Sequence, residues 1–82
     1  MNVNMKMPDL SATEGSDIVI IKWFVEVGAR VERGKPILEV ETDKAVQEIE
    51  AIATGTLAAI HVQANDRVPV GELIATIEVR KS

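Results

Sequence analysis

The feature that most constrains this 82-residue chain is an internal repeat with a constant offset of 37 positions. Eight positions of the first half recur in the same order in the second half, six of them as the same residue. Because similar units of this length bury their apolar faces against one another, the repeat predicts two halves related by a pseudo-two-fold axis. The first set is Val25, Gly28, Arg30, Val31, Gly34, Ile37, Val40 and Glu41, and the second is Val62, Asn65, Arg67, Val68, Gly71, Ile74, Ile77 and Glu78.

One unlike pair of the repeat, Gly28 and Asn65, predicts the backbone conformation at a turn. Glycine adopts positive φ without steric cost, and asparagine is among the few other residues that do so. We therefore expect a positive-φ residue at the same turn of both halves.

The composition favours short strands over bundled helices. Val, Ile and Ala supply most of the apolar mass, and Trp23 and Phe24 are the only aromatic residues. Apolar runs or alternation predict strands over Val3–Met7, Ile18–Val27 and Leu57–Val62, with the second strand the longest and Trp23 in the core. Two such halves can pack their apolar faces together as a flattened all-β barrel or sandwich, which also protects the sheet edges.

A single lysine lies at the predicted turn in the middle of the chain. Acidic residues alternate through Ile37–Glu41 and again through Gln47–Ala51, as expected for two half-buried strands. Thr42–Ala45 must then turn. No Gly or Asn lies at its centre, which argues against a tight mirror-image hairpin and for a loop built on the common type I turn. Lys44 is expected to point outward from a fixed position.

Length and charge exclude several classes of function. The chain supports one domain with a modest core, which argues against a multi-residue enzyme cleft. Its 9 basic and 13 acidic residues give a formal charge of −4, which argues against nucleic acid or an anionic membrane as partner.

Residue types and hydropathy exclude further classes. There is no cysteine, and His61, expected to face outward from a strand, has no second imidazole with which to share a metal. No apolar run approaches the ~20 residues of a membrane span, and no cationic leader precedes Met7. We therefore expect no catalytic or metal site, and a soluble protein of a reducing compartment.

The central turn resembles a known modification motif. Residues 41–45, Glu-Thr-Asp-Lys-Ala, are similar to the attachment motif of lipoyl domains. These are the swinging-arm carriers of the E2 acyltransferase component of 2-oxo acid dehydrogenase complexes. The resemblance extends over nearly the whole chain, through Met7–Leu10, Trp23–Gly28, Gly34–Ala45, Gly55 and Val68–Gly71.

The resemblance implies a fold and a domain organisation. The fold is a barrel-sandwich hybrid of two four-stranded antiparallel sheets with pseudo-two-fold symmetry, with the central turn at the end opposite both termini. Residues 1–80 would form a single lipoyl-type carrier domain, with 81–82 a frayed end or the start of a linker. The chain departs from the common family pattern at Ala29, Lys35, Ile52 and Asn65.

The resemblance also implies function, cofactor and partners. Lys44 would carry covalent lipoate, and the domain would be a non-catalytic carrier of acyl groups and electrons, in the cytoplasm or in the mitochondrial matrix of a eukaryote. Its partners would be the thiamine-diphosphate-dependent 2-oxo acid dehydrogenase, the acyltransferase core, dihydrolipoamide dehydrogenase, and a lipoate ligase or lipoyl transferase. The residues expected to take part in recognition are Asp43, Ala45, Glu41 and Glu14.

Three alternatives remain open at this point. Biotin carboxyl carrier domains share the fold and place Met on both sides of their lysine, as in Met5-Lys6-Met7. Lys6, however, lies in a predicted strand, whereas both families require the lysine at the central turn. Two further readings are a bare β-sandwich interaction module and a glycine-cleavage carrier, which is usually longer.

The loop over Leu10–Asp17 generates the first testable prediction. If both termini lie opposite Lys44, the first strand runs toward the lysine, and this polar loop, which contains Glu14, emerges beside it. Replacing residues 11–16 with a Gly/Ser segment of equal length should leave Lys44 lipoylation intact and sharply lower the rate of reductive acylation by the thiamine-dependent enzyme. Unchanged acylation of the folded, fully lipoylated variant would instead assign recognition to the acids flanking Lys44.

Overall fold

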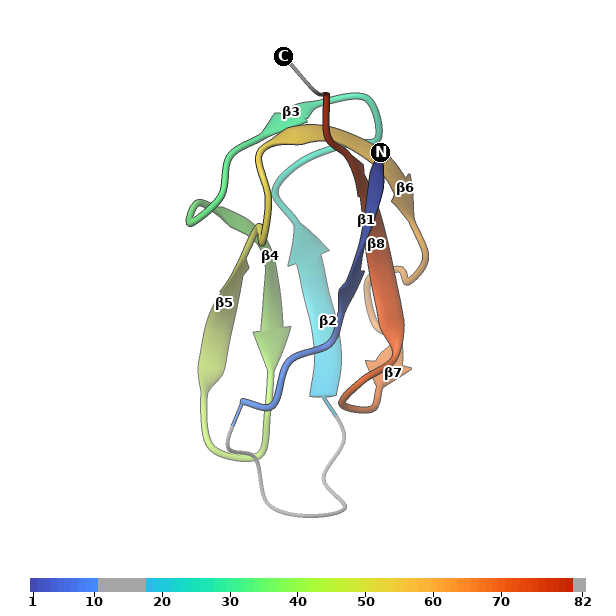
Figure 1. The fold of residues 1–82 in the computed structure, drawn as a ribbon. Helices are drawn as coiled ribbons and strands as arrows, with labels where there is room; N and C mark the ends of the chain where they lie inside the picture. The colour runs from blue at the N-terminus through green and yellow to red at the C-terminus, as the bar shows by residue number, and fades with distance from the viewer. Residues whose placement is uncertain (11–17, 81–82) are drawn as a thin grey trace.

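A computed structural model describes residues 1–10 and 18–80 of the chain. This part of the chain is all-β, and its strands form two four-stranded antiparallel sheets with the orders β1-β8-β6-β3 and β5-β4-β2-β7 (Figure 1). The predicted fold class is therefore confirmed. The strands are β1 (Asn2–Lys6), β2 (Ile18–Trp23), β3 (Arg30–Val31), β4 (Pro36–Glu41), β5 (Val46–Glu50), β6 (Gly55–Ile60), β7 (Arg67–Val68) and β8 (Leu73–Glu78).

The two halves are joined by reciprocal backbone hydrogen bonds. The N–H of Gly28 donates to the carbonyl of Leu57 (2.8 Å), and the N–H of Asn65, 37 positions after Gly28, donates to that of Ile20 (2.7 Å). Leu57 in turn donates to Ala29 (2.8 Å), as Ile20 donates to Asp66 (2.9 Å). Each half thus binds the other through the same set of bonds, and the predicted pseudo-two-fold symmetry is present in the backbone.

The turns that precede β3 and β7 have the predicted conformation. Gly28 has φ of +96° and Asn65 has φ of +75°. The second turn of each half repeats this agreement, with Gly34 at +88° and Gly71 at +90°. Because most side chains resist this region of φ, the correspondence explains why only Gly and Asn occupy these four positions.

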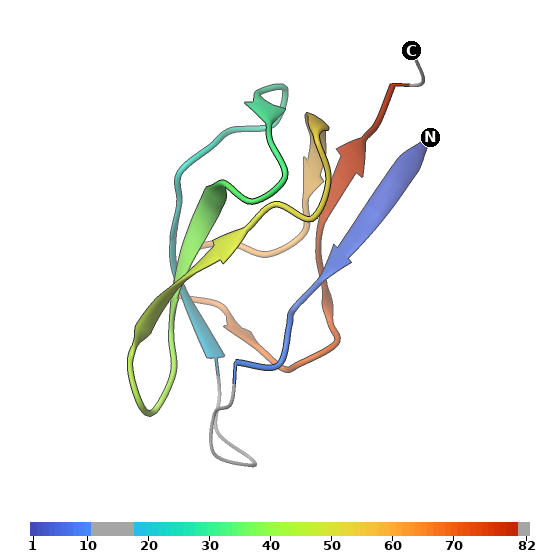
Figure 2. The ribbon, with the colours of Figure 1, turned by 60° about the vertical axis from the view of Figure 1, so that its left-hand side comes forward.

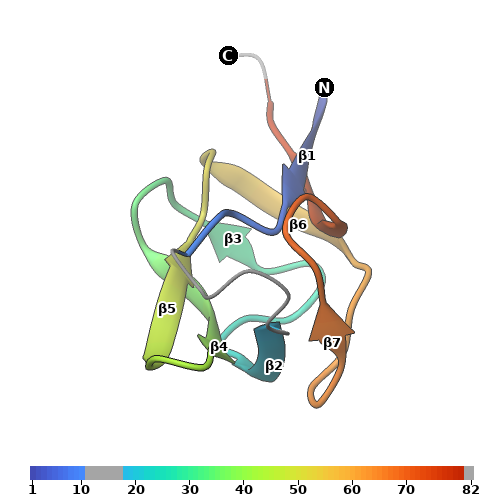
Figure 3. The ribbon, with the colours of Figure 1, turned by 90° about the horizontal axis from the view of Figure 1, so that it is seen from below.

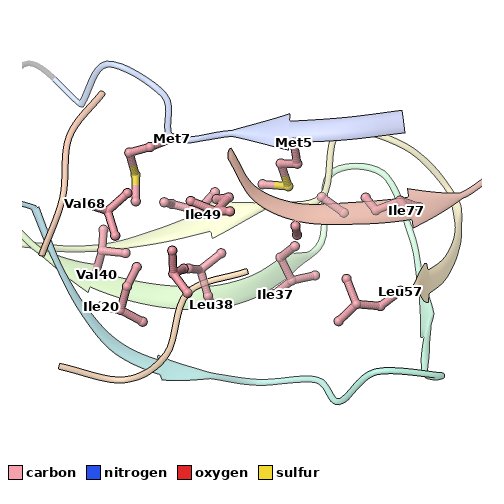
Figure 4. Packing of buried hydrophobic residues seen from close by; sticks show 14 of the residues in the cluster. Met5, Met7, Ile20, Ile37, Leu38, Val40, Ile49, Leu57, Val68 and Ile77 are labelled. Carbon is pink, nitrogen blue, oxygen red and sulfur yellow. The ribbon is translucent and has the colours of Figure 1, made fainter. Parts of the chain in front are cut away.

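The core lies between the two sheets and receives residues from both halves (Figure 4). Figure 3, seen from below, shows the strands arranged around this interior. Trp23 lies at its margin, half-buried against the core, and its indole Nε1 donates to the carbonyl of Val62 (3.0 Å). The buried apolar residues are Met5, Met7, Ile18, Ile20, Val31, Ile37, Leu38, Val40, Ile49, Ala51, Leu57, Val62, Val68, Ile74, Ala75 and Ile77.

The strand expected over Ile18–Val27 is shorter than predicted, because β2 ends at Trp23. The next residue, Phe24, donates its N–H to Ile37 (2.8 Å), and the chain then crosses to the other sheet, where Gly28 is bonded. Beyond Trp23, only Val25 of this run packs against the core, while Phe24 and Val27 are exposed. Apolar periodicity alone does not mark where a strand leaves one sheet for the other.

The termini and the central turn lie at opposite poles. β1 begins and β8 ends at one end of the molecule, and the β4–β5 turn lies at the other end (Figure 1). The rotated view in Figure 2 keeps this arrangement. The register explains it, because Glu78 pairs with Asn2 as the equivalent Glu41 pairs with Val46. β4 and β5 are joined by a turn at one pole. The equivalent strands β8 and β1 are not joined, and the end of β8 and the start of β1 lie at the other pole.

Gly55 generates a prediction about stability. A Cβ at this first residue of β6 would overlap the backbone carbonyl oxygen of Glu78 on the neighbouring strand. Since backbone cannot yield as a flexible side chain does, we expect Gly55→Ala to lower the free energy of unfolding by about 2 kcal/mol in urea denaturation. Gly28→Asn is the control, expected to cost less than about 1 kcal/mol because Asn65 occupies the equivalent turn. Equal losses in the two variants would contradict the steric explanation.

Candidate functional site

The central turn is a short connection between β4 and β5. Glu41 pairs with Val46 at the ends of the strands, and the N–H of Thr42 donates to the carbonyl of Ala45 (2.9 Å). Among the described residues other than glycine, Asn65 alone has positive φ, so neither Asp43 nor Lys44 adopts it. The tight mirror-image turns require positive φ, and their predicted absence here is confirmed.

The hydroxyl of Thr42 organises this turn. Thr42 is 7% exposed and is the one buried polar residue in the described part of the chain. Its Oγ1 accepts from the N–H of Lys44 (3.2 Å) and of Ala45 (3.3 Å), and donates to the carbonyl of Ala45 (3.1 Å). Threonine hydroxyls commonly bond backbone groups two or three residues ahead in turns, so a threonine at the first position of the turn is the sequence signal for this role.

Lys44 is presented outward. Asp43, Lys44 and Ala45 are all exposed, and they form the tip of the turn at the pole opposite the termini (Figure 1). Lys44 lines neither of the two shallow grooves described on the molecule, one between β1 and β5 and one beside β3. The exposed lysine therefore lies outside both of these grooves.

The outer face of β4 and β5 is strongly acidic. Glu39 lies directly opposite Glu48, and Glu41 lies beside the turn, opposite Val46. Like charges directly opposite one another across a strand pair are destabilising, so folding alone does not favour this arrangement. Lys22, opposite Glu39 on the other side, supplies the one positive charge of that row. The lysine thus projects beside a negatively charged surface.

The structure brings four of the five predicted site residues together. Lys44, Asp43, Ala45 and Glu41 lie at or beside one turn. Glu14 belongs to residues 11–17, which lie outside the described residues.

The segment that leads into those residues is held near the turn. Leu10 accepts a hydrogen bond from the side-chain amide of Gln47 (3.4 Å), so the chain entering 11–17 lies against β5.

Two other residues considered from sequence lie elsewhere. Lys6, of the Met-Lys-Met segment, is in β1 and pairs with Leu73, so it is not at a turn. His61 is exposed, as predicted, but it follows the last residue of β6 and is not in a strand; its Nε2 lies 2.9 Å from Oγ1 of Thr76. No group of three or more acidic or histidine side chains in residues 1–10 and 18–80 is arranged to hold a metal ion. No helix there is long and apolar enough to cross a membrane.

Comparisons with known proteins agree with this geometry. A family model for biotin/lipoyl domains, described as "Biotin-requiring enzyme", matches residues 3–77. A similar solved structure is the solution structure of the lipoyl domain of the 2-oxoglutarate dehydrogenase complex from Azotobacter vinelandii. It has a TM-score of 0.76 and 32% identity, over 94% of this chain and 96% of that one.

Similar full-length proteins share one description. The dihydrolipoyllysine-residue acetyltransferase component of the pyruvate dehydrogenase complex of Rhizobium meliloti (strain 1021) is 45% identical over 80 residues, which are 94% of this chain and 17% of that protein. The component of the same name from Corynebacterium glutamicum is 42% identical over 76 residues, 90% of this chain and 11% of that protein. The chain therefore spans less than a fifth of the length of these relatives.

Fold and turn together define a barrel-sandwich domain that presents one lysine at the pole opposite its ends. With the family match over residues 3–77, the chain belongs to the biotin/lipoyl family.

The opposed acids give a prediction about stability and salt. We expect Glu48→Gln to raise the free energy of unfolding by about 0.5 kcal/mol at low ionic strength, because it removes one of two facing like charges. The gain should largely vanish in 1 M salt, where screening acts over about 3 Å. Urea denaturation at both salt concentrations measures this. Glu26→Gln, which neutralises an exposed acid of the β2–β3 connection, is the control and should change neither value. A salt-independent gain would point to packing and not to charge.

Proposed function

We propose that Lys44 is lipoylated and that the domain is a swinging-arm carrier of a 2-oxo acid dehydrogenase complex. The observation that carries the proposal is an exposed lysine, within the Glu-Thr-Asp-Lys-Ala segment, at a turn whose backbone is bonded to a buried threonine. A lipoyl group would fit here, because Lys44 is exposed at the tip of the turn and lines neither of the two described grooves. The chain itself performs no catalysis in this scheme.

The chain's own residues would hold, orient and present the group. Lys44 supplies the primary amine for an amide bond and a flexible four-carbon stem, while the turn limits where that stem begins. A bound lipoyl group supplies a dithiolane that accepts acyl groups and electrons. Because β1 begins and β8 ends at the far pole (Figure 1), a tether attached there would not lie between the lysine and partner sites. Tethering then raises the effective concentration at each site to about millimolar without tight docking.

The acids beside the lysine are proposed as the recognition surface. Asp43 and Glu41 lie at the turn, and Glu39 and Glu48 extend the negative face along the two strands. Repulsion between these acids lowers the stability of the free domain, and a partner with basic residues would relieve it. Complementary charge also steers the encounter of two proteins and fixes their orientation. The partners we propose are the thiamine-dependent dehydrogenase, the acyltransferase core, dihydrolipoamide dehydrogenase and a lipoate ligase or lipoyl transferase. Ala45, small and exposed, leaves the approach to the lysine open.

Lipoate is favoured over biotin as the attached group. The names of the similar proteins refer to dihydrolipoyllysine and to a lipoyl domain. The Met-Lys-Met segment that resembles the biotin motif lies at the end of β1, with Lys6 the last residue of the strand, Met5 and Met7 buried and only Lys6 exposed. Its lysine therefore lacks the turn geometry that both kinds of carrier use. We place the domain in the cytoplasm, where the complexes named for its bacterial relatives would act.

Mass spectrometry tests the proposal. Coexpressed with a lipoate ligase and lipoate, the chain should gain one lipoyl group, and peptide mapping should place it on Lys44. Lys44→Arg is the matched control, since it keeps the charge and removes the acylatable amine, and it should gain nothing. Parallel coexpression with a biotin ligase and biotin should leave the mass unchanged. A biotinyl group on Lys44, modification at Lys6, or an unmodified chain would each contradict the proposal.

A further inference from the structure

The pseudo-two-fold symmetry permits a direct comparison of the turn with its equivalent at the other pole. Thr42 and Ala45 correspond to Val79 and Met1. One backbone bond is the same in both places: Thr42 N–H donates to Ala45 (2.9 Å), and Val79 N–H donates to Met1 (2.8 Å). Thr42 and Ala45 within the turn are therefore joined by the same type of bond as Val79 and Met1 near the two ends of the chain.

The second bond of each pair differs. At the termini, the nitrogen of Met1 donates to the backbone carbonyl of Val79 (3.2 Å). At the turn, the N–H of Ala45 donates to the side-chain oxygen Oγ1 of Thr42 (3.3 Å). The threonine hydroxyl has taken the place of a backbone carbonyl. Of the two equivalent positions, Val79 at the termini has no hydroxyl, and Thr42 at the turn has the hydroxyl that accepts this bond.

The hydroxyl also engages the lysine itself. The N–H of Lys44 donates to the same oxygen (3.2 Å), and that hydroxyl donates to the carbonyl of Ala45 (3.1 Å). One donor and two acceptor sites are the full capacity of a hydroxyl, so Oγ1 is fully used. These bonds are long for their types, but the three converge on one atom. A β-branched side chain has few rotamers, and this one is buried, so that atom has a fixed position.

We propose that Thr42 is a positioning residue, whose hydroxyl sets the direction in which Lys44 leaves the turn and so the rate at which a ligase modifies it. This rests on the proposed function of Lys44. The hydroxyl acts on two backbone N–H groups of exposed residues, so the core does not depend on it. Val79 at the equivalent position shows that the fold accommodates an isosteric side chain without a hydroxyl.

Two substitutions and a control test the proposal on the whole chain. Thr42→Val removes the hydroxyl at constant shape, and Thr42→Ser keeps it. Thr54→Val is the matched control, because Oγ1 of Thr54 accepts from the N–H of Arg33 (3.0 Å) in the β5–β6 connection, away from Lys44. Amide hydrogen exchange measured by NMR should be faster at Lys44 and Ala45 in Thr42→Val alone, with the core amides unchanged.

Ligase kinetics supply the second readout. A misdirected amine reaches the activated lipoyl group less often, so kcat should fall about tenfold in Thr42→Val, with KM changed by less than about twofold. Thr42→Ser should recover most of the rate, and Thr54→Val should match the wild type.

Several outcomes would overturn the proposal. Wild-type lipoylation or unchanged exchange at Lys44 and Ala45 in Thr42→Val would do so, as would an unfolded Thr42→Val, because the hydroxyl would then support the fold and not the turn alone. Absence of lipoylation in the wild-type chain would instead refute the proposed function, and the exchange measurement would still decide whether Thr42 holds the turn.

Discussion

The reciprocal pairing of the two halves is the constraint on which the rest of the structure depends. Each half gives its short strand to the sheet of the other, since β3 pairs with β6 and β7 pairs with β2. Neither half can complete a sheet alone, so the fold forms as one unit dominated by contacts distant in sequence, which is typical of slowly folding topologies. The same pairing places the turn after β4 at the pole opposite the start of β1 and the end of β8 (Figure 1). Because of this separation, Lys44 at the turn points away from the ends of the chain.

The departures from the common family pattern leave this framework intact. Asn65 keeps the positive φ of the glycine that it replaces. Ala29 and Lys35 still close their turns through backbone bonds to Glu26 (3.0 Å) and Glu32 (3.0 Å). Backbone hydrogen bonds and φ values, and not the side chains at these positions, therefore maintain the turns. Ile52, in place of a common Pro, is 48% exposed, so its change alters the surface and not the core.

The two faces of the β4–β5 hairpin differ in burial and in charge. Toward the core, Leu38, Val40 and Ile49 anchor the hairpin, with none more than 4% exposed. Toward solvent, facing acids such as Glu39 and Glu48 accept a cost that the core offsets. A rigid apolar inner face and a repulsive outer face are together consistent with a domain that must stay folded while other proteins engage its surface.

The sequence by itself determined the fold class, the pseudo-symmetry and the location of the lysine. These properties follow from local regularities: the offset of 37 positions, the alternation of acids around residues 42–45, and the Gly or Asn at each positive-φ turn. Each is set by backbone sterics or by the period of a strand, which act over a few residues and leave a visible pattern.

Only the tertiary structure decided where β2 ends, which acids face each other and what the hydroxyl of Thr42 contacts. β2 ends at Trp23, and after Phe24, which still bonds to Ile37 of β4, the chain crosses to the other sheet, where Gly28 bonds to Leu57. Glu39 and Glu48 are opposed because β4 and β5 keep one register from the turn back to Leu38, and the irregularity between Pro36 and Leu38 lies beyond this pair. Thr42 binds Lys44 and Ala45 because burial fixes its rotamer. Bulges, crossings and rotamers depend on which distant segments meet, and a linear pattern carries no record of that.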